Sequence, residues 1–510
     1  ERSLSLKVWT REVLNEFIQS RMDGYRFIVV SNREPYSHRY TPNGKIECIQ
    51  PASGMATALE PVMRATGGLW IAHGSGDADR AVVDERDHVR VPPKNAKFDL
   101  RRVWLSPEQV EGHYDGLSNQ GLWPLCHVAF TRPYFEPRHW KLYQQVNQIF
   151  ADAVLEEAGN EPTFVFIQDY HFGLLPRMLR KANANLVVAQ FWHIPWPNRE
   201  VFCSFPWQEE LLDGLLGNDL LGFHLHQHCQ NFLDTVDRSL ETLVDPCSMN
   251  IKREGRSTLV RAFPISIDYD EHVGQAKSAG VRRDTENWRK ELNLNGRSLV
   301  GIGIDRLDYT KGIPDRLRAV DRLLELRPEY RGRLVFTQIG VPSRSTLKAY
   351  REIEEEIDEL VERINLRWST PDWKPVTLLK KHFGPQRLIA LHRLAKFCVV
   401  SSLHDGMNLV AKEFVASRND EDGVLVLSKF AGAARELQDS LLINPFSIEE
   451  TAAAYERALE MPLDERRRRM QKLRSEVETN NVYRWAGKFL SALTKFEFRE
   501  PALAAAGAAA

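Results

Sequence analysis

Cysteine is scarce in this sequence and is never paired at short spacing. Only six cysteines occur in 510 residues, and none forms a Cys-x-x-Cys motif. A disulfide-stabilised scaffold needs closely spaced cysteines in a short chain. The pattern therefore excludes that class and favours a reducing, cytoplasmic location.

Long apolar runs and an excess of charge of one sign are also missing. There is no signal-peptide pattern and no apolar stretch of about 18 residues or more, which a membrane helix requires. Lys and Arg number 68 against 69 Asp and Glu, so the formal net charge is −1. Nucleic-acid and acidic-membrane partners favour a basic excess. We therefore expect neither partner, while a homo-oligomer stays open.

The sequence does contain a regular alternation of strand-like and helical segments. Apolar runs recur as YRFIVVSN, TFVFIQ, LVVAQFWHI, DLLGFH, SLVGIGI, RLVFTQIG, FCVVSSL and GVLVLS. Helical patterns such as WKLYQQVNQIFADAVLEEA lie between them. Apolar strands separated by helices predict parallel sheets covered on both faces. The expected fold class is α/β, with doubly wound domains.

Two groups of polar, chemistry-bearing residues predict two domains. One group lies within 31–224 and the other within 305–436, whereas 245–297 reads as polar and irregular apart from LVRAFPISI. We expect a first domain over 1–264, beginning with a helix at 1–24, and a second over 265–479. Residues 498–510 read as a disordered tail. Ligands bind doubly wound sheets at the carboxyl ends of their strands, so a site is expected in the cleft between the domains.

The segment DRLDYTKG places two cations, Arg306 and Lys311, directly after a predicted strand. Arginine as a planar fork and lysine as a point charge together suit a diphosphate. A surface turn held by salt bridges explains the same residues equally well. The Walker A pattern GxxxxGK[ST] is absent.

The segment HDGMNLVAKE predicts a helix that begins near Asn408. The backbone N–H groups of Leu409 and Val410 would then form an anion site at the helix N-terminus. Glu413, one turn further on, can accept two hydroxyls, as from a ribose, and Asp405 can bind sugar hydroxyls. The simpler alternative is a turn residue and a helix-stabilising charge.

Polar residues also follow the strands of the first half. Asp169 and His171 come after TFVFIQ, His193 ends the next strand, Arg33 ends the first, and Gly54 opens a helix-like run. A single histidine at a strand end is most often a core residue. Polar residues at two strand ends facing one cleft make a functional site an equal alternative.

The segment HLHQHC at 224–229 offers metal-like ligands. On a strand, alternate histidines would share a face. No second Cys/His pair lies at zinc spacing, so we prefer a polar loop and helix start and expect no metal.

In their order and spacing, these stretches resemble the trehalose-6-phosphate synthase family of retaining glycosyltransferases, which is related to glucosylglycerol-phosphate synthases. The resemblance covers about 25–497 and includes SNR, GGLW, YDGLSNQGLWP, QDYH, HIPWP, DRLDYTKG, DGMNLVAKEF and LSKFAGAARELQDSLLINP. It implies a GT-B fold, with two Rossmann-like domains facing a central cleft. It also implies that the last helix, at 480–497, crosses back to the first domain.

The resemblance implies a role for each matching residue. The diphosphate would be bound by Arg306 and Lys311, and the ribose by Glu413. The donor set is Gly54, His193, Arg306, Lys311, Asp405, Asn408, Leu409, Val410 and Glu413, and the acceptor set is Arg33, His73, Tyr114, Trp123, Asp169 and Arg344. The implied catalytic residues are Asp169, His193, Arg306, Lys311 and Asp405.

The reaction that the resemblance implies moves glucose from a nucleotide diphosphate glucose, UDP-glucose before others, to glucose 6-phosphate, giving trehalose 6-phosphate. Transfer would retain the anomeric configuration without a covalent nucleophile, and the leaving diphosphate would help deprotonate the acceptor. Two small-molecule substrates are then the partners, and no cofactor is expected.

Several departures from the family pattern keep other acceptors open. His73 stands about where the family has a second Trp, and His404 replaces an Arg. The long loop REPYSHRYTPNGKIECIQPASG contains NREPY and PNGK, which resemble glucosylglycerol-phosphate synthases, and Ser53 replaces a glycine. Glycerol 3-phosphate or another phosphorylated acceptor is the close alternative. An inactive, regulatory sugar-phosphate-binding homologue is a further one, against which the complete donor motif argues.

Overall fold

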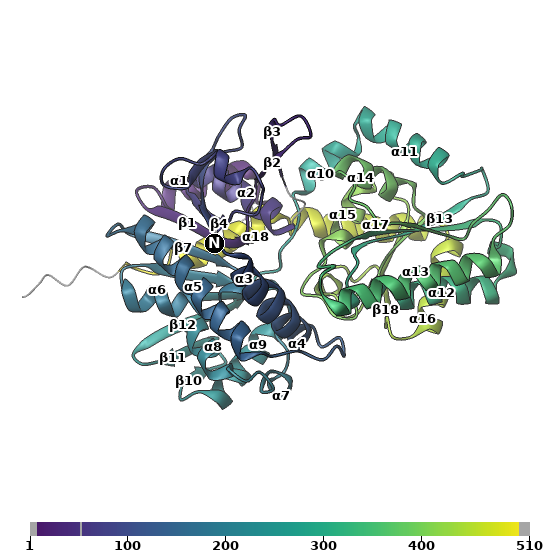
Figure 1. Ribbon diagram of the computed structural model, residues 1–510. Coiled ribbons are helices and arrows are strands. Elements are labelled where there is room, and N and C mark those ends of the chain that lie inside the picture. Colours follow the sequence, from purple (N-terminus) through teal and green to yellow (C-terminus); the bar gives the residue numbers. More distant parts are fainter. Residues whose placement is uncertain (1–7, 51–53, 499–510) are drawn as a thin grey trace, which may run out of the picture. The chain divides into compact units, whose positions relative to one another are not determined.

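The computed structural model describes residues 8–50 and 54–498 and divides the chain into two compact units (Figure 1). The first unit takes in the chain up to Pro264 and again from Tyr483 onward, and the second runs from Ile265 to Val482. The expectations for residues 1–7, for Ser53 and for most of the tail lie outside the described residues. The chain passes between the units twice, so the first unit is assembled from two separate segments.

The first unit is built on a ten-stranded sheet with the order β10-β11-β12-β9-β8-β7-β1-β4-β6-β5. Neighbouring strands from β12 to β6 are parallel, and β5, β10 and β11 pair antiparallel at the edges. The strands are β1 (Arg26–Arg33), β4 (Leu69–His73), β5 (His88–Val91), β6 (Phe98–Val103), β7 (Thr163–Gln168), β8 (Val187–Phe191), β9 (Leu220–Phe223), β10 (Leu243–Asp245), β11 (Asn250–Arg253) and β12 (Arg256–Ala262). The strand order reverses between β1 and β7, which makes the carboxyl ends of these two strands the expected ligand position.

Helices cover both faces of this sheet. They are α1 (Arg11–Arg21), α2 (Gly54–Thr66), α3 (Pro107–Val110), α4 (Trp123–His127), α5 (Pro137–Ala158), α6 (Leu175–Ala182), α7 (Arg199–Phe202), α8 (Gln208–Leu215), α9 (His226–Ser239) and α18 (Val482–Leu493). One core forms where Phe150 of α5 and Leu179 of α6 pack on apolar strand residues. On α18, Phe489 stacks on Phe166 of β7 with ring centroids 4.2 Å apart.

An unusual π-helix, η2 (Glu111–Leu122), precedes α4 in the first unit. Its glycines allow close packing, because a Cβ at Gly112 would lie 2.2 Å from Leu142 and one at Gly116 would lie 2.5 Å from His139. Both partners belong to α5. Stretches of π-helix are rare and often mark functional sites. The sequence did not predict this element.

The second unit carries a six-stranded, fully parallel sheet with the order β15-β14-β13-β16-β17-β18. Its strands are β13 (Leu299–Arg306), β14 (Leu334–Val341), β15 (Val376–Leu379), β16 (Phe397–Val400), β17 (Val424–Ser428) and β18 (Leu441–Ile443). Counted along the unit, this is the order 3-2-1-4-5-6 of the Rossmann fold, with its reversal between β13 and β16. The α/β class and the doubly wound arrangement predicted from sequence are confirmed.

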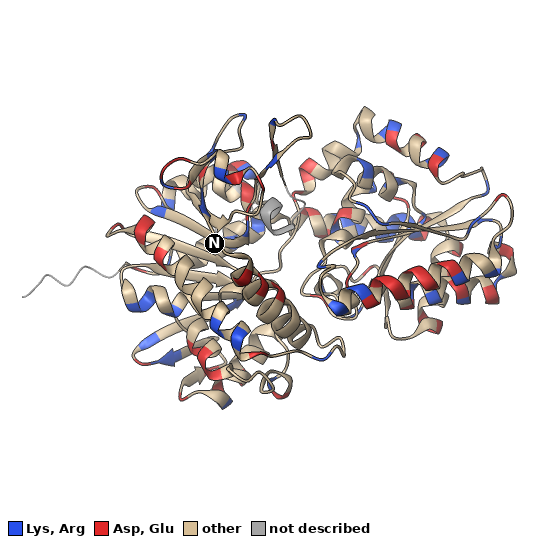
Figure 2. Cartoon of the chain, in the orientation of Figure 1, with Lys and Arg blue, Asp and Glu red and all other residues tan. Residues whose placement is uncertain are grey.

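Two helical layers cover the second sheet (Figure 1). The helices are α10 (Tyr269–Ala276), α11 (Ala279–Glu291), α12 (Ile313–Leu326), α13 (Lys348–Trp368), α14 (Pro385–Leu394), α15 (Leu409–Ser417), α16 (Ile448–Glu460) and α17 (Leu463–Thr479). Helices α12, α13 and α16 pack together, whereas α10, α11, α14, α15 and α17 form the other group. Figure 2 shows that acidic and basic residues are interspersed on both units.

The expectation of an irregular segment at 245–297 was wrong. The structure has α10 and α11 there, besides strand β11. Helix α11 buries only Val281 and Trp288 and is otherwise charged or polar. With only two buried apolar residues, the sequence of this helix shows little of the apolar periodicity from which a helix is predicted. Within 8–50 and 54–498, no helix combines the length and hydrophobicity of a membrane span.

Candidate active site

The turn after β13 brings two of the predicted cations to the end of the second sheet. Arg306 is the last residue of β13, and Lys311 ends the 3-10 turn η4 (Tyr309–Lys311). Asp308 caps that turn, because its Oδ1 accepts from the Thr310 amide at 2.9 Å and from the Thr310 hydroxyl at 2.8 Å. Gly312 follows with φ +62°, and a Cβ there would lie 2.3 Å from the Ser401 carbonyl oxygen. Glycine therefore lets the turn approach the end of β16.

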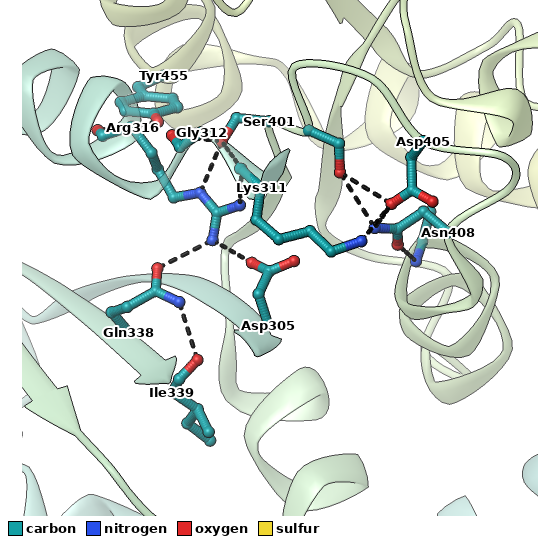
Figure 3. Close-up of polar contacts among 12 residues, drawn as sticks. Asp305, Lys311, Gly312, Arg316, Gln338, Ile339, Ser401, Asp405, Asn408 and Tyr455 are labelled. Carbon is teal, nitrogen blue, oxygen red and sulfur yellow. Dashed lines mark hydrogen bonds and ion pairs between the residues drawn. The ribbon is translucent and has the colours of Figure 1, made fainter. Parts of the chain in front are cut away.

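A second turn, between β16 and α15, carries Asp405 and Asn408. Lys311 Nζ lies 2.5 Å from Asp405 Oδ2. The same oxygen accepts from the Asn408 amide at 3.2 Å and from the Ser402 hydroxyl at 3.1 Å. Asn408 is the N-cap of α15, with Oδ1 3.4 Å from the Ala411 amide. The predicted cation, carboxylate and helix start thus form one connected group (Figure 3).

Helix α15 begins at Leu409, as the sequence predicted, so the first amides of the helix belong to Leu409 and Val410. These N–H groups have no partner within the helix and form the positive end of its dipole. Arg306 and Lys311 belong to the neighbouring turn of the same sheet edge. Anion binding is the chemistry that this combination supports.

Glu413 lies one turn along α15 and is half-buried. Burial raises the pKa of its carboxyl to about 7. Ionising a buried carboxyl costs free energy when it has no hydrogen-bond donors. Donors such as a vicinal pair of hydroxyls therefore stabilise its charged form more than they would stabilise an exposed carboxylate.

A buried arginine that the sequence did not single out supports both turns. Arg316 of α12 is fully buried and places Nη1 2.6 Å from Asp305 Oδ2 and 2.9 Å from Gln338 Oε1. Its Nε donates to the Ser401 hydroxyl at 2.9 Å, and that hydroxyl donates to the Lys311 carbonyl at 3.2 Å. Figure 3 shows the guanidinium between Ser401 and Gly312 on one side and Asp305 and Gln338 on the other. It acts as a scaffold for the cation turn.

Arg344, predicted on the acceptor side, belongs to the second unit and follows β14. Its Nη1 lies 2.5 Å from the Tyr350 hydroxyl and 3.8 Å from Asp308 Oδ2. Its φ of 50° is left-handed, a strained conformation for a residue other than glycine. Asp308 therefore lies beside both Arg344 and the turn of Lys311.

In the first unit, four predicted residues gather where parallel strands end. Arg33 ends β1, His73 ends β4, Asp169 follows β7 and His193 follows β8. Asp169 has φ 72° and Oδ1 3.1 Å from the His193 amide. His193 Nε2 lies 2.9 Å from Gln168 Oε1, which can only accept, so Nε2 carries the proton. Burial lowers the pKa of His193 to about 3, which keeps the ring neutral.

The π-helix supplies an aromatic partner to this group. Arg33 Nη2 donates to the Tyr114 hydroxyl at 2.6 Å, and the Tyr114 ring stacks on His171 with centroids 5.6 Å apart. Trp123 opens α4 and is buried against His127, with centroids 4.1 Å apart. The structure thus joins Arg33 with Tyr114 and Asp169 with His193. Trp123 is close to Tyr170, the neighbour of Asp169 in the chain, with ring centroids 6.0 Å apart.

His73, the residue at the departure from the family pattern, is held by the sheet. Its Nδ1 lies 3.2 Å from the Val103 carbonyl oxygen, and burial lowers its pKa, so the ring is neutral. Gly54 is the first residue of α2, as the sequence suggested. The histidine-rich segment at 224–229 runs into α9, which begins at His226. Among the described residues, no group of three or more His, Cys, Asp or Glu side chains is arranged to hold a metal ion.

The long loop after β1 forms a hairpin, β2 (Ser37–Tyr40) with β3 (Ile46–Ile49). Arg102 is buried beneath it, with Nε 2.8 Å from Glu34 Oε2 and Nη2 2.9 Å from Asp79 Oδ1. The His38 amide donates to Asp79 Oδ1 at 2.7 Å. Burial raises the pKa of Glu34 to about 7. This network ties the hairpin to Glu34, the residue that follows Arg33 at the end of β1.

The chain has two Rossmann-like units, and at one sheet edge the second brings cations, a helix N-terminus and a half-buried carboxylate together. This arrangement is the one expected of a glycosyltransferase of the GT-B class, and comparisons with known proteins show that class. Residues 25–495 match the family model Glycosyltransferase family 20. The chain belongs to that family.

Relatives with solved structures or assigned names share nearly the whole chain. Trehalose-6-phosphate synthase of Mycobacterium sp. (strain KMS) is 40% identical over 474 residues, which is 92% of this chain and 94% of that protein. A solved E. coli structure with bound UDP-2-fluoro glucose is 32% identical, with a TM-score of 0.83 over 93% of this chain and all of the other. A UDP-forming alpha,alpha-trehalose-phosphate synthase from Burkholderia xenovorans, in complex with glucose-6-phosphate, is 32% identical with a TM-score of 0.82, covering 92% and 99%.

Proposed function

We propose that this protein is a retaining trehalose-6-phosphate synthase that uses UDP-glucose and glucose 6-phosphate. The observation that carries the proposal is the connected donor group in the second unit. It consists of a strand-end cation, a lysine–carboxylate pair of 2.5 Å and the start of α15. Relatives at 40% and 32% identity carry the matching name or ligands.

The proposed roles follow from charge and geometry. The diphosphate would be held by Arg306, Lys311 and the first amides of α15, which neutralise the charge that builds on the leaving group. Glu413 would accept the ribose hydroxyls, and Asp405 and His193 would position the donor sugar. Asn408 would hold Asp405 in place, and Gly54 would let the backbone approach the diphosphate.

The acceptor roles are assigned in the same way. The phosphate of glucose 6-phosphate would be bound by Arg33 with Tyr114 and by Arg344. Asp169 would accept from the acceptor hydroxyls, while His73 and Trp123 would shape the pocket. In the reaction the bond from the anomeric carbon to the diphosphate oxygen breaks, and a bond to the anomeric oxygen of the acceptor forms. The acceptor proton goes to the leaving diphosphate, so the step needs no redox partner, cofactor or metal.

A second acceptor class is supported by one specific observation. The hairpin β2–β3 is tied to the end of β1 through Arg102, Glu34 and Asp79, so the unusual loop is part of the Arg33 neighbourhood. Glycerol 3-phosphate, or another phosphorylated acceptor, is the alternative. We propose cytoplasmic action, because all six cysteines are free thiols in the structure, as a reducing compartment would keep them.

The test is a donor and acceptor screen with purified protein. UDP-, ADP- and GDP-glucose are each combined with glucose 6-phosphate, glycerol 3-phosphate, fructose 6-phosphate and mannose 6-phosphate. Nucleotide release is followed and each product is identified by mass. Release that depends on glucose 6-phosphate supports the proposal. Release with another acceptor only would assign a different transferase, and no release with any pair would favour the regulatory alternative.

A further inference from the structure

Asp308 is a buried carboxylate among cations that the proposed function assigns to two different substrates. Its side chain is completely inaccessible to solvent. Burial would raise its pKa, but the positive charges of Arg306, Arg344 and Lys311 lower it overall. The carboxylate is therefore ionised at neutral pH, and a buried charge of this kind needs several partners.

The two oxygens of this carboxylate face different parts of the site. Oδ1 accepts from the Thr310 amide at 2.9 Å and from the Thr310 hydroxyl at 2.8 Å, which fixes the turn that ends in Lys311. The Asp308 carbonyl also accepts from the Lys311 amide at 3.1 Å. One side of Asp308 thus sets the position of a proposed donor-phosphate cation.

The other oxygen faces the proposed acceptor-phosphate cation. Oδ2 accepts from the Tyr350 hydroxyl at 3.3 Å and lies 3.8 Å from Arg344 Nη1, which itself donates to the Tyr350 hydroxyl at 2.5 Å. Tyr350 is 2% exposed and belongs to α13. The buried Asp308 carboxylate and the buried Tyr350 hydroxyl thus hold the Arg344 guanidinium in place. The Arg344 backbone is itself strained, with φ at 50°.

We infer that Asp308 is a positioning residue that holds the donor-phosphate and acceptor-phosphate cations in register through its two oxygens, with Tyr350 as the link to Arg344. The inference rests on the proposed function for the identity of the two phosphates. Asp308 is buried and touches no substrate in this role. Its effect is on the geometry from which transfer starts, where small displacements cost much of the rate.

Because Asp308 is charged, a variant that removes only the charge distinguishes a positioning role from simple structural support. Asp308→Asn removes a negative charge from among three cations, which makes the site more attractive to phosphate. The amide keeps one oxygen for Thr310 and loses the ionic contact to Arg344. We expect the Kd for UDP to be equal to or lower than that of the wild type, while kcat falls at least about tenfold. A fold defect would instead weaken binding and turnover together.

A second variant tests the acceptor arm alone. Tyr350→Phe keeps every charge and removes only the hydroxyl between Arg344 and Asp308. We expect the KM for glucose 6-phosphate to rise severalfold and the Kd for UDP to stay unchanged. Asp422→Asn is the matched control, because Asp422 is a partly buried carboxylate of the same unit whose Oδ1 lies 2.5 Å from Arg466 Nε. It should leave both constants at the wild-type values.

The measurements are kcat and KM from UDP release, Kd for UDP from calorimetry and the unfolding temperature of each variant. A folded Asp308→Asn protein with kcat within twofold of the wild type would overturn the inference. So would parallel losses of UDP affinity, kcat and unfolding temperature. If the wild type transfers glucose only to another phosphorylated acceptor, the same constants are measured with that acceptor. A wrong acceptor and a wrong role for Asp308 therefore give different results.

Discussion

Lys311 and Asp405 are 94 positions apart in the chain, yet Lys311 Nζ and Asp405 Oδ2 lie 2.5 Å apart at the edge of the second sheet. The contact joins the turn after β13 to the turn before α15. It also places a positive charge in front of a helix start that already favours anions. A diphosphate bound there would contact the same Lys311 ammonium as the Asp405 carboxylate does. Binding of the diphosphate by Lys311 and positioning of the donor sugar by Asp405 are therefore linked.

The first prediction concerns the carboxylate of that pair. Asp405→Asn should leave the Kd for UDP close to that of the wild type, because Arg306, Lys311 and the α15 amides still hold the diphosphate. Turnover should fall by about 100-fold or more, since the donor sugar loses its positioning contact. Calorimetry with UDP and initial rates with UDP-glucose check the two parts. Normal turnover in a folded Asp405→Asn protein would refute the assigned role.

The second prediction concerns the strand-end arginine. Arg306→Ala should lower kcat/KM by about 30-fold or more, equivalent to about 2 kcal/mol, because one charge-assisted contact to the leaving group is lost. Arg333→Ala is the matched control, since Arg333 is an exposed arginine of the same unit. The control should keep wild-type activity. Near-normal turnover of the Arg306 variant would rule out the diphosphate assignment.

The third prediction follows from the raised pKa of Glu413, about 7 against a usual 4.5. Between these pH values the folded protein holds a proton that the unfolded chain has released, so folding stability contributed by this group falls as pH rises from 4.5 through 7. Glu413→Gln removes the penalty of a buried charge. Its unfolding temperature, relative to the wild type, should therefore be higher at pH 8 than at pH 4.5.

The same variant should bind UDP more weakly at pH 8, because an amide accepts ribose hydroxyls less strongly than a carboxylate. Unfolding scans across the pH range and calorimetry with UDP measure the two effects. The exposed Glu359→Gln on α13 is the matched control. If the Glu413 and Glu359 variants respond to pH in the same way, the assignment of this titration to Glu413 is incorrect.

The fourth prediction concerns acceptor choice. His73→Trp restores the residue type that the family pattern has at about this position, and the larger ring changes the shape of the acceptor side. We expect altered relative rates among glucose 6-phosphate, glycerol 3-phosphate and mannose 6-phosphate, while the KM for UDP-glucose stays unchanged. The acceptor screen, repeated on the variant, measures this. An acceptor profile identical to that of the wild type would exclude His73 as a determinant.

The fifth prediction concerns the scaffold beneath the cation turn. A Cβ at Gly303 would lie 2.3 Å from Arg316 Nη1 and 2.4 Å from Gln338 Oε1, so Gly303→Ala must displace the buried guanidinium. We expect a loss of about 1–3 kcal/mol of stability and a lower kcat. Gly296→Ala is the control, because its Cβ would meet nothing within 4 Å. Equal unfolding temperatures for the two variants would contradict the scaffold role of Arg316.

Sequence reasoning located the residues at strand ends because an apolar run followed by a polar residue is a local signal. Arg306, Asp169 and the helix start at Leu409 were all visible in this way, as was the α/β class. The parallel pairing that brings Lys311 to Asp405 was not visible, because contacts across 94 positions leave no periodic trace. Only the assignment of both residues to the donor side came from the resemblance to a family.

Buried residues that position the side chains of the site were not predicted, for a different reason. Asp308 and Arg316 stand inside motifs that read as surface turns or helix faces, and only burial shows their roles. The π-helix at Glu111–Leu122 also escaped, since its hydrogen-bond period matches neither the helical nor the strand pattern. Its glycines at 112 and 116 were the available signal, and they mark close packing on α5.

The discontinuous first unit constrains how the chain matures on the ribosome. Phe489, from the returning helix α18, covers Phe166 of β7 and also contacts Phe263, with ring centroids 5.1 Å apart. Phe166 and Phe263 are synthesised long before the helix that covers them, because about 220 residues of the second unit intervene. At roughly 5–20 residues per second the delay is on the order of 10 to 40 seconds. The contiguous second unit is thus the first body that can be completed, and an aromatic strip of the nascent first unit awaits helix α18 until the second unit has been synthesised.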